Sequence, residues 1–180
     1  TLATIYIIRD PRNLVNSISN HFSKSVEDSK KFLFTPKIIT KFEKEDDLEN
    51  KSLITLLGTW NEHYKFWKNN NENFLLIRYE DLINNTNSEL NKIIAFIKKF
   101  TPIKTDEIKN KNIIKTTSFN YLQKLEEKGG FNENAYDTND TKKKFFNLGP
   151  KNNWENILNK KIKEEIESKF YVEMKELGYL

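Results

Sequence analysis

Arg9 and Ser17 are the two residues whose types and spacing are best suited to binding an anion. Arg9 directly follows residues 5–8, a short apolar run that predicts a buried strand of a parallel sheet. Asp10 and Pro11 then predict the start of a helix, because Asp can cap its free N–H groups and Pro suits its first position. Ligands of open α/β sheets bind beyond the carboxyl ends of the strands, where a helix N-terminus and a guanidinium both favour phosphate or sulfate.

Ser17 lies on the helix that follows this turn, at the border of its apolar stripe. Its side chain could face the same side as Arg9 and donate its hydroxyl to the same anion. The alternative interpretation is that Arg9 is a surface cation and Ser17 a neutral helix residue. Both interpretations are compatible with this stretch alone.

A second apolar run, residues 74–78, also predicts a strand, and Tyr79 follows it directly. Tyr79 could therefore reach the same crevice as Arg9, where its ring could stack on a flat ligand. Glu80 and Asp81 come next along the chain. Paired acids suggest general acid–base catalysis, but at a strand-to-helix turn we interpret them as capping and hydrogen-bonding residues.

Two later stretches carry further candidates. Thr117 precedes a predicted helix and is a cap candidate, whereas Phe119 is either a core residue or a stacking surface. The lysines at 142–144 stand close to the turn at Gly149 and could gather phosphates, with the backbone N–H groups of the turn. The alternative for this stretch is a solvated charged loop.

Apolar periodicity predicts the remaining helices over residues 52–69, 86–100, 105–111, 118–128 and 160–177. His63 lies in the first of these, among aromatic residues, and is better explained as partly buried than as catalytic. Residues 23–50 are polar and contain Pro36, which breaks any long helix. We expect a connection with short helical turns there, which either covers a site as a lid or is a simple surface excursion.

Composition bounds the class of protein. At 180 residues the chain suits one domain, and 30 basic against 26 acidic residues leave a net charge of +4, which is weak evidence for nucleic acid as a partner. The absence of cysteine excludes disulfides and thiolate metal sites.

No apolar run approaches the roughly 20 residues of a membrane span, and no signal peptide opens the chain, so a cytoplasmic protein is the default expectation. The first core strand begins within four residues of Thr1, and we expect further residues upstream.

Five stretches, in order, resemble a PAPS-dependent sulfotransferase of the cytosolic type. Residues 7–12 with Ser17 are similar to the family's 3′-phosphate motif, and residues 59–67 to a family helix. The Tyr-Glu-Asp at 79–81 matches the segment whose tyrosine contacts adenine. The Thr-Ser-Phe at 117–119 resembles a second adenine segment, and residues 145–154 resemble the Arg-Lys-Gly…Trp loop that closes over the 3′-phosphate.

This resemblance implies an α/β fold with a P-loop-type parallel sheet flanked by helices, incomplete at its N-terminus, with residues 1–180 as the C-terminal part of one sulfotransferase domain. It implies PAPS as co-substrate, PAP as product, and a hydroxyl or amine of a small molecule, glycan or lipid as acceptor. The implied nucleotide-binding residues are Arg9, Ser17, Tyr79, Thr117, Phe119 and Gly149. No metal is implied.

The sequence also departs from the family pattern. Asn147 and Leu148 replace the Arg-Lys of the late loop, and Lys144 or Lys151 could supply the missing charge. The family's phosphosulfate-binding loop and catalytic histidine are expected upstream, since neither His21 nor His63 occupies the catalytic position; we therefore expect this chain not to catalyse alone. The alternatives are a non-catalytic nucleotide-binding module of the same fold, and a P-loop kinase-like enzyme, which would need a Gly-x-x-x-x-Gly-Lys-Ser/Thr loop that this chain lacks.

Overall fold

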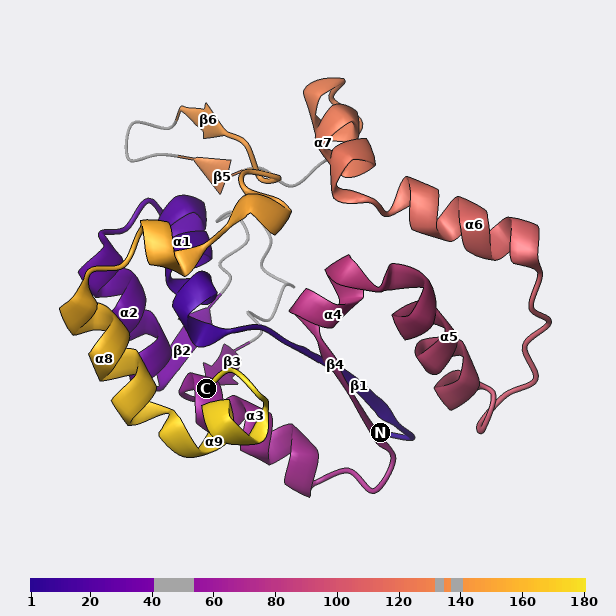
Figure 1. Cartoon of the computed structure of the whole chain (residues 1–180), viewed down its shortest axis with the longest axis horizontal. Helices are drawn as coiled ribbons and strands as arrows, with labels where there is room; N and C mark the ends of the chain where they lie inside the picture. The colour runs from indigo at the N-terminus through magenta and orange to yellow at the C-terminus, as the bar shows by residue number, and fades with distance from the viewer. Residues whose placement is uncertain (41–53, 132–134, 137–140) are drawn as a thin grey trace, which may run out of the picture.

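A parallel pair of strands forms the centre of the molecule. The computed structural model describes residues 1–40, 54–131, 135–136 and 141–180. Strands β1 (Thr4–Ile8) and β4 (Phe74–Arg78) pair in parallel through the middle of the molecule, with Ile8 opposite Arg78 (Figure 1). Both predicted strands and the parallel pairing are confirmed. The expected burial of the first strand is wrong in part: Ile5 is 38% and Ile7 is 54% exposed, because in the described residues β1 pairs with β4 alone. The register brings the residues after the two strands, Arg9 and Tyr79, to the same edge of the sheet.

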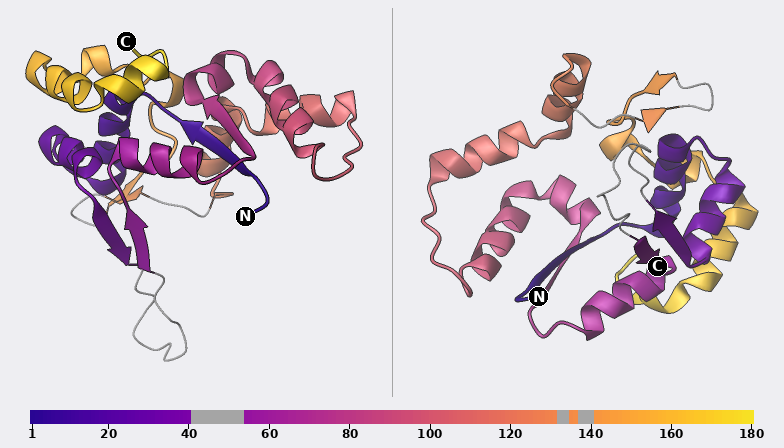
Figure 2. Two further views of the ribbon diagram at one scale, coloured as in Figure 1. Left: turned by 90° about the horizontal axis from the view of Figure 1, so that it is seen from below. Right: turned by 180° about the vertical axis from the view of Figure 1, so that it is seen from behind.

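The other elements form helical layers and two short hairpins around this pair. In Figures 1 and 2, α1, α2, α8 and α9 gather on one side of the β1–β4 pair, and α4 to α7 extend on the other. Strands β2 and β3 pair antiparallel, as do β5 and β6. In chain order these elements are α1 (Pro11–Phe22), α2 (Val26–Phe34), β2 (Lys37–Thr40), β3 (Ile54–Leu57), α3 (Trp60–Asn69), α4 (Tyr79–Asn84), α5 (Thr86–Ile97), α6 (Glu107–Thr116), α7 (Phe119–Glu127), β5 (Ala135–Tyr136), β6 (Lys142–Lys143), the 3₁₀ turns η1 (Gly149–Lys151) and η2 (Trp154–Asn156), α8 (Lys160–Lys169) and α9 (Tyr171–Glu176).

Helix α1 starts where the sequence predicts it. The Asp10 carboxylate accepts a hydrogen bond from the Arg12 backbone N–H at 2.9 Å, and Pro11 occupies the first helical position. Val15 is fully buried on the face turned toward the core. The helix ends where Ser23 adopts a left-handed conformation, with φ 51°.

The C-terminal helices close the core. Ile162, Ile166, Phe170 and Met174 are all buried, as their helical spacing predicts. The predicted single helix over 160–177 is nevertheless two helices, because Phe170 leaves helical geometry (φ −114°, ψ 20°) between α8 and α9. At this break the Phe170 ring packs against the rings of Phe34 and Trp60.

The prediction of one helix over 52–69 is wrong in its first part. Residues 54–57 form β3 instead, and the helix begins only at Trp60. Thr59 and Glu62 form a reciprocal capping box, in which the Glu62 carboxylate accepts from the Thr59 N–H at 2.8 Å. Leu56, expected on the apolar stripe, is 77% exposed, and Leu53 lies outside the described residues. The Thr-x-x-Glu signature marks the true start of the helix.

The expected surface connection over 23–50 is partly core. Residues 26–34 form α2, which packs between α1 and α8 with Leu33 buried and Ser29 fully buried. Helix α2 is therefore part of the folded body rather than a lid. Residues 37–40 form the strand β2 instead of a helical turn, and residues 41–50 lie outside the described residues. Within the described ranges, no helix has the length and apolar character needed to cross a membrane.

His63 is held by a tyrosine of the central strand. The Tyr6 hydroxyl lies 2.7 Å from His63 Nδ1, and the Trp67 ring meets the imidazole edge-on. Burial lowers the pKa of His63 and raises the pKa of Tyr6 to about 12. His63 is thus a partly buried structural residue, as the sequence indicates.

This burial predicts a pH dependence of stability. Because the folded state disfavours imidazolium, the unfolded chain binds a proton more readily than the folded chain. The free energy of unfolding is therefore expected to fall as the pH drops below about 6.5, the ordinary pKa of histidine, toward the lowered pKa of the folded state. Urea denaturation between pH 7.5 and 5.5 measures this slope. In His63→Gln the slope is expected to flatten; an unchanged slope would show that another group is responsible.

Candidate functional site

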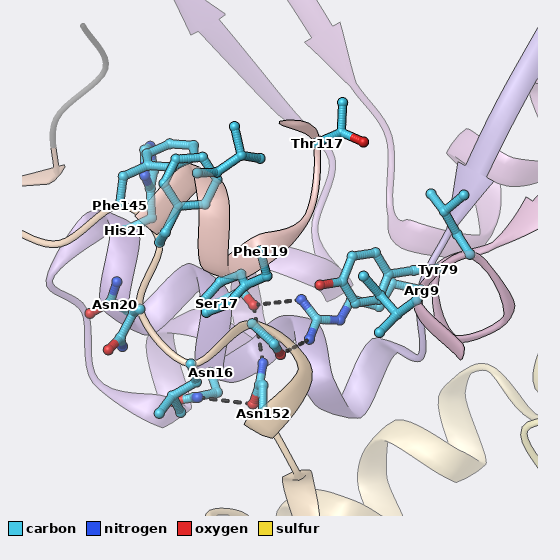
Figure 3. A pocket seen from close by; sticks show the side chains of 17 residues that line it. Arg9, Asn16, Ser17, Asn20, His21, Tyr79, Thr117, Phe119, Phe145 and Asn152 are labelled. Atoms are coloured by element: carbon cyan, nitrogen blue, oxygen red, sulfur yellow. Dashed lines mark hydrogen bonds between the residues drawn. The ribbon is translucent and has the colours of Figure 1, made fainter. Parts of the chain in front are cut away.

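Arg9 is the centre of the site (Figure 3). Its Nη1 donates to Ser17 Oγ at 3.2 Å, and its Nη2 donates to the Gly149 carbonyl at 3.4 Å. Its guanidinium carbon lies 4.2 Å from the centroid of the Tyr79 ring, a cation–π contact. Four parts of the chain therefore meet at the Arg9 side chain: the end of β1, helix α1, the start of α4 and the late loop.

A cavity of about 480 Å³ opens beside Arg9. Ligand cavities in proteins range over roughly 300–1,000 Å³, so a nucleotide-sized ligand is within its capacity. All six predicted binding residues line it. The lining consists of Arg9, Asn16, Ser17, Asn20, His21, Tyr79, Leu82, Ile83, Thr117, Phe119, Leu122, Phe145, Phe146, Asn147, Leu148, Gly149 and Asn152.

The cavity has a polar wall and an aromatic wall. The polar wall comes from α1 and Asn152. The aromatic wall comes from Phe119, Phe145 and Phe146, and the Phe146 ring meets each of the other two edge-on. Thr117 is exposed at the rim, and its hydroxyl donates to the Ile113 carbonyl at 2.7 Å. Such an amphipathic cavity suits a ligand with a flat apolar part and an anionic part.

Gly149 is required by the close approach of Phe119. It adopts φ +51°, and a Cβ atom built on it would lie 2.2 Å from the Phe119 ring. The absence of a side chain therefore allows the late loop to pass directly over the aromatic wall.

Replacing Gly149 with alanine is expected to displace the Phe119 ring and destabilise the fold. Gly129→Ala is a matched control, because Gly129 also has a positive φ (+74°) but nothing within 4 Å of a built Cβ. Each substitution costs about 1–2 kcal/mol for the left-handed backbone, and Gly149→Ala is expected to cost about 1–3 kcal/mol more for the overlap. Urea denaturation measures both; equal losses would contradict this view of the loop.

Asn152 belongs to the site although nothing in the sequence selected it. Its amide is buried, and Nδ2 donates to the Asn13 carbonyl at 2.9 Å and to Ser17 Oγ at 3.2 Å. Its Oδ1 accepts from Asn16 Nδ2 at 3.0 Å. Asparagine is abundant in this chain, so residue type alone carries no signal here.

Arg12 and Glu80 both hydrogen-bond to Asp10, which lies next to Arg9 at the start of α1. Arg12 binds the Asp10 carboxylate through both Nε and Nη2, donates to Glu167 at 2.5 Å, and lies 4.2 Å from the Trp154 ring. Glu80 accepts hydrogen bonds from the Asp10 N–H at 3.1 Å and from the Tyr179 hydroxyl at 3.0 Å. These contacts bear out the interpretation of Glu80 as structural rather than as a catalytic acid or base.

The cavity carries little positive charge. Among its described lining residues, Arg9 is the single lysine or arginine. Lys144 pairs with Glu127 at 2.8 Å, and Lys151 is exposed; neither lines the cavity, so neither takes the place of the missing cations there. The two replaced positions, Asn147 and Leu148, do line it. The described residues contain no cluster of three or more His, Cys, Asp or Glu side chains that could hold a metal ion.

One donor of Arg9 has no acceptor. Its Nε is buried and makes no hydrogen bond to any described residue. A buried guanidinium N–H without an acceptor is costly, and because this nitrogen exposes almost no surface, a ligand in the cavity would contact Arg9 through its Nη groups. The charge of the Arg9 guanidinium, which lines the cavity, is what suits the site to an anion.

The fold and this cavity define an α/β protein with a cavity beyond the ends of two parallel strands. The chain belongs to the sulfotransferase domain family, which matches residues 2–178. It is 31% identical over 124 residues to a 3-beta-hydroxysteroid sulfotransferase of Cavia porcellus, and 33% identical over 125 residues to a 3-alpha-hydroxysteroid sulfotransferase of the same species. Each match covers 68% of this chain but only 39% of the relative.

A solved structure shows the same fold. The crystal structure of mouse sulfotransferase SULT7A1 complexed with PAP superposes with a TM-score of 0.63 at 19% identity, covering 96% of this chain and 58% of that chain. The predicted α/β fold and family are therefore confirmed, and membership of this family sets aside the kinase-like alternative.

Proposed function

We propose that the cavity binds the adenosine 3′,5′-bisphosphate part of PAPS, and that this chain supplies the nucleotide half of a sulfotransferase site. The observation that carries this proposal is that all six residues expected at the nucleotide line one cavity. Arg9 and Gly149, which contact each other there, lie 140 residues apart. Residues so far apart in the sequence come together only through the fold of the chain.

Arg9 and Ser17 are assigned to the 3′-phosphate. Arg9 provides a planar guanidinium that lines the cavity, and Ser17 provides a hydroxyl beside it. Hydrogen bonds between a charged donor and a charged acceptor are roughly twice as strong as neutral ones. The pair therefore binds a phosphate oxygen more strongly than a sugar hydroxyl at the same place.

Tyr79, Thr117 and Phe119 are assigned to adenine. The Arg9 guanidinium stacks on one face of Tyr79, and the residue lines the cavity, where its ring can contact the base. The Thr117 hydroxyl already donates to a backbone carbonyl, so toward a ligand it acts as an acceptor, which suits an exocyclic amino group. Phe119 offers an aromatic surface held against the late loop.

The proposed reaction is transfer of a sulfuryl group from PAPS to an acceptor hydroxyl. A sulfur–oxygen bond to the acceptor forms as the bond to the nucleotide's 5′-phosphate breaks, the acceptor proton passes to a base, and PAP leaves. The names of the two curated relatives favour a hydroxysteroid or a similar small hydroxyl compound as acceptor. We assign neither the base nor a phosphosulfate-binding lysine to a residue of this chain; His63, hydrogen-bonded to Tyr6, is not a candidate.

The test is release of PAP from PAPS by the full-length natural protein in the presence of 3-hydroxysteroids. Acceptor-dependent PAP formation that is lost in Arg9→Ala is the expected result. PAP binding without any turnover over a panel of hydroxyl and amine acceptors would instead identify a non-catalytic nucleotide-binding module.

A further inference from the structure

Asn152 contacts the anion site without contributing charge. It is 8% exposed, and its amide touches Ser17, Asn13 and Asn16, all on α1. Because the Asn13 carbonyl can only accept, it fixes the Nδ2 end of the Asn152 amide toward α1. The orientation of this side chain is therefore set by the backbone beneath the site.

The Ser17 hydroxyl receives two hydrogen bonds. Arg9 Nη1 and Asn152 Nδ2 each donate to Ser17 Oγ, both at 3.2 Å (Figure 3). A hydroxyl oxygen has two acceptor lone pairs and one hydrogen to donate. Both lone pairs are thus occupied before any ligand binds, and only the hydrogen remains to be placed.

That hydrogen has a poor partner within the protein. The acceptor that it reaches is the Asn13 carbonyl, at a long 3.4 Å from Ser17 Oγ. The same carbonyl already accepts from Asn152 at 2.9 Å and, as part of helix α1, from the backbone N–H four residues later. An acceptor in the cavity beside Arg9 would therefore be the better partner for the Ser17 hydrogen.

We propose that Asn152 is a positioning residue that makes the Ser17 hydroxyl a dedicated donor to the nucleotide's 3′-phosphate. This inference rests on the proposed function and adds to it a residue that sets nucleotide specificity. With two cations replaced by Asn147 and Leu148, the site relies on Arg9 and on neutral donors, so the direction of each donor matters more. Asn152 thus favours nucleotides that carry a 3′-phosphate over those that do not.

The test compares the affinities for PAP and AMP, which differ by the 3′-phosphate, using calorimetry on the chain. In Asn152→Asp a carboxylate would accept the Ser17 hydrogen and repel the phosphate, so PAP affinity is expected to fall roughly 10- to 100-fold. Affinity for AMP is expected to stay within about twofold, because AMP has no group at this position. Asn153→Asp is the matched control: it adds the same charge one residue later, outside the cavity lining, and retains the helix-capping acceptor for the Glu155 N–H.

A double-mutant cycle gives an independent test, because the aspartate variant places a charge at a buried position. If Asn152 acts through Ser17, Asn152→Ala lowers PAP affinity about tenfold in the unmodified chain, but about twofold or less when Ser17 is already alanine. Equal losses in both backgrounds, or parallel losses of PAP and AMP affinity, would overturn the positioning role. Failure of the unmodified chain to bind PAP would overturn the proposed function itself, which the control with unmodified protein reveals first.

Discussion

Replacing Arg9 with alanine is expected to lower the affinity of the chain for PAP by roughly 100-fold, the largest functional effect of any single substitution. The substitution removes the single lysine or arginine among the described cavity residues, and with it the hydrogen bonds to Ser17 and the Gly149 carbonyl. It also leaves the Tyr79 ring without its stacked cation. Calorimetric titration with PAP measures the loss.

Arg78→Ala is the matched control for this experiment. Arg78 ends β4 directly beside the end of β1, but it pairs with Asp81 and stacks on Tyr179 instead of lining the cavity. Its removal is expected to change PAP affinity less than about threefold. Arg9→Lys should recover only part of the affinity, since an ammonium keeps the charge without the planar fork. PAP binding by Arg9→Ala at the affinity of the unmodified chain would remove Arg9 from the site.

Replacing Arg12 with alanine is expected to cause the largest loss of stability, about 3–5 kcal/mol of unfolding free energy. Arg12 neutralises the Asp10 carboxylate, which is 5% exposed, and also binds Glu167 and the Tyr179 carbonyl. Without Arg12 the buried Asp10 carboxylate loses the cation with which it pairs. Urea denaturation followed by circular dichroism measures the change.

Lys163→Ala serves as the comparison for Arg12. Lys163 approaches the same two partners, with Nζ 3.8 Å from Glu167 and 5.3 Å from the Trp154 ring, but its side chain is 40% exposed. An exposed pair of this kind contributes about 0–1 kcal/mol. Similar losses in the two variants would show that burial of the Asp10–Arg12 pair is not what stabilises this region.

The sequence predicts the centre of the fold well, because the relevant signals are local. Two short apolar runs are sufficient for β1 and β4, and the Asp-Pro pair is sufficient for the start of α1. The prediction of a helix over 52–69 is wrong in its first part, because the apolar residues there match a helical spacing by chance. The capping box at Thr59 marks the actual start of the helix. The break at Phe170 coincides with contacts between its ring and those of Phe34 and Trp60, which are distant in sequence and which no local pattern contains.

The site is predicted where it follows the strand ends and missed where it depends on tertiary contacts. Arg9 and Tyr79 leave parallel strands in register, so their meeting is a consequence of the sheet. Asn152 reaches Ser17 across 135 residues of chain, and its role arises from the hydrogen bonds it makes there. By sequence position Lys144 is a candidate to replace a lost cation, but it forms an ion pair with Glu127 and does not line the cavity.

The most direct test of the central claim is calorimetric titration of the unmodified chain with PAP and, in parallel, with AMP, beside a circular dichroism spectrum. A folded chain with an anion site at Arg9 and Ser17 is expected to bind one PAP per chain saturably, and to bind AMP distinctly more weakly. A folded chain that binds neither nucleotide, or that binds both equally, would contradict the assignment of this cavity to a nucleotide with a 3′-phosphate.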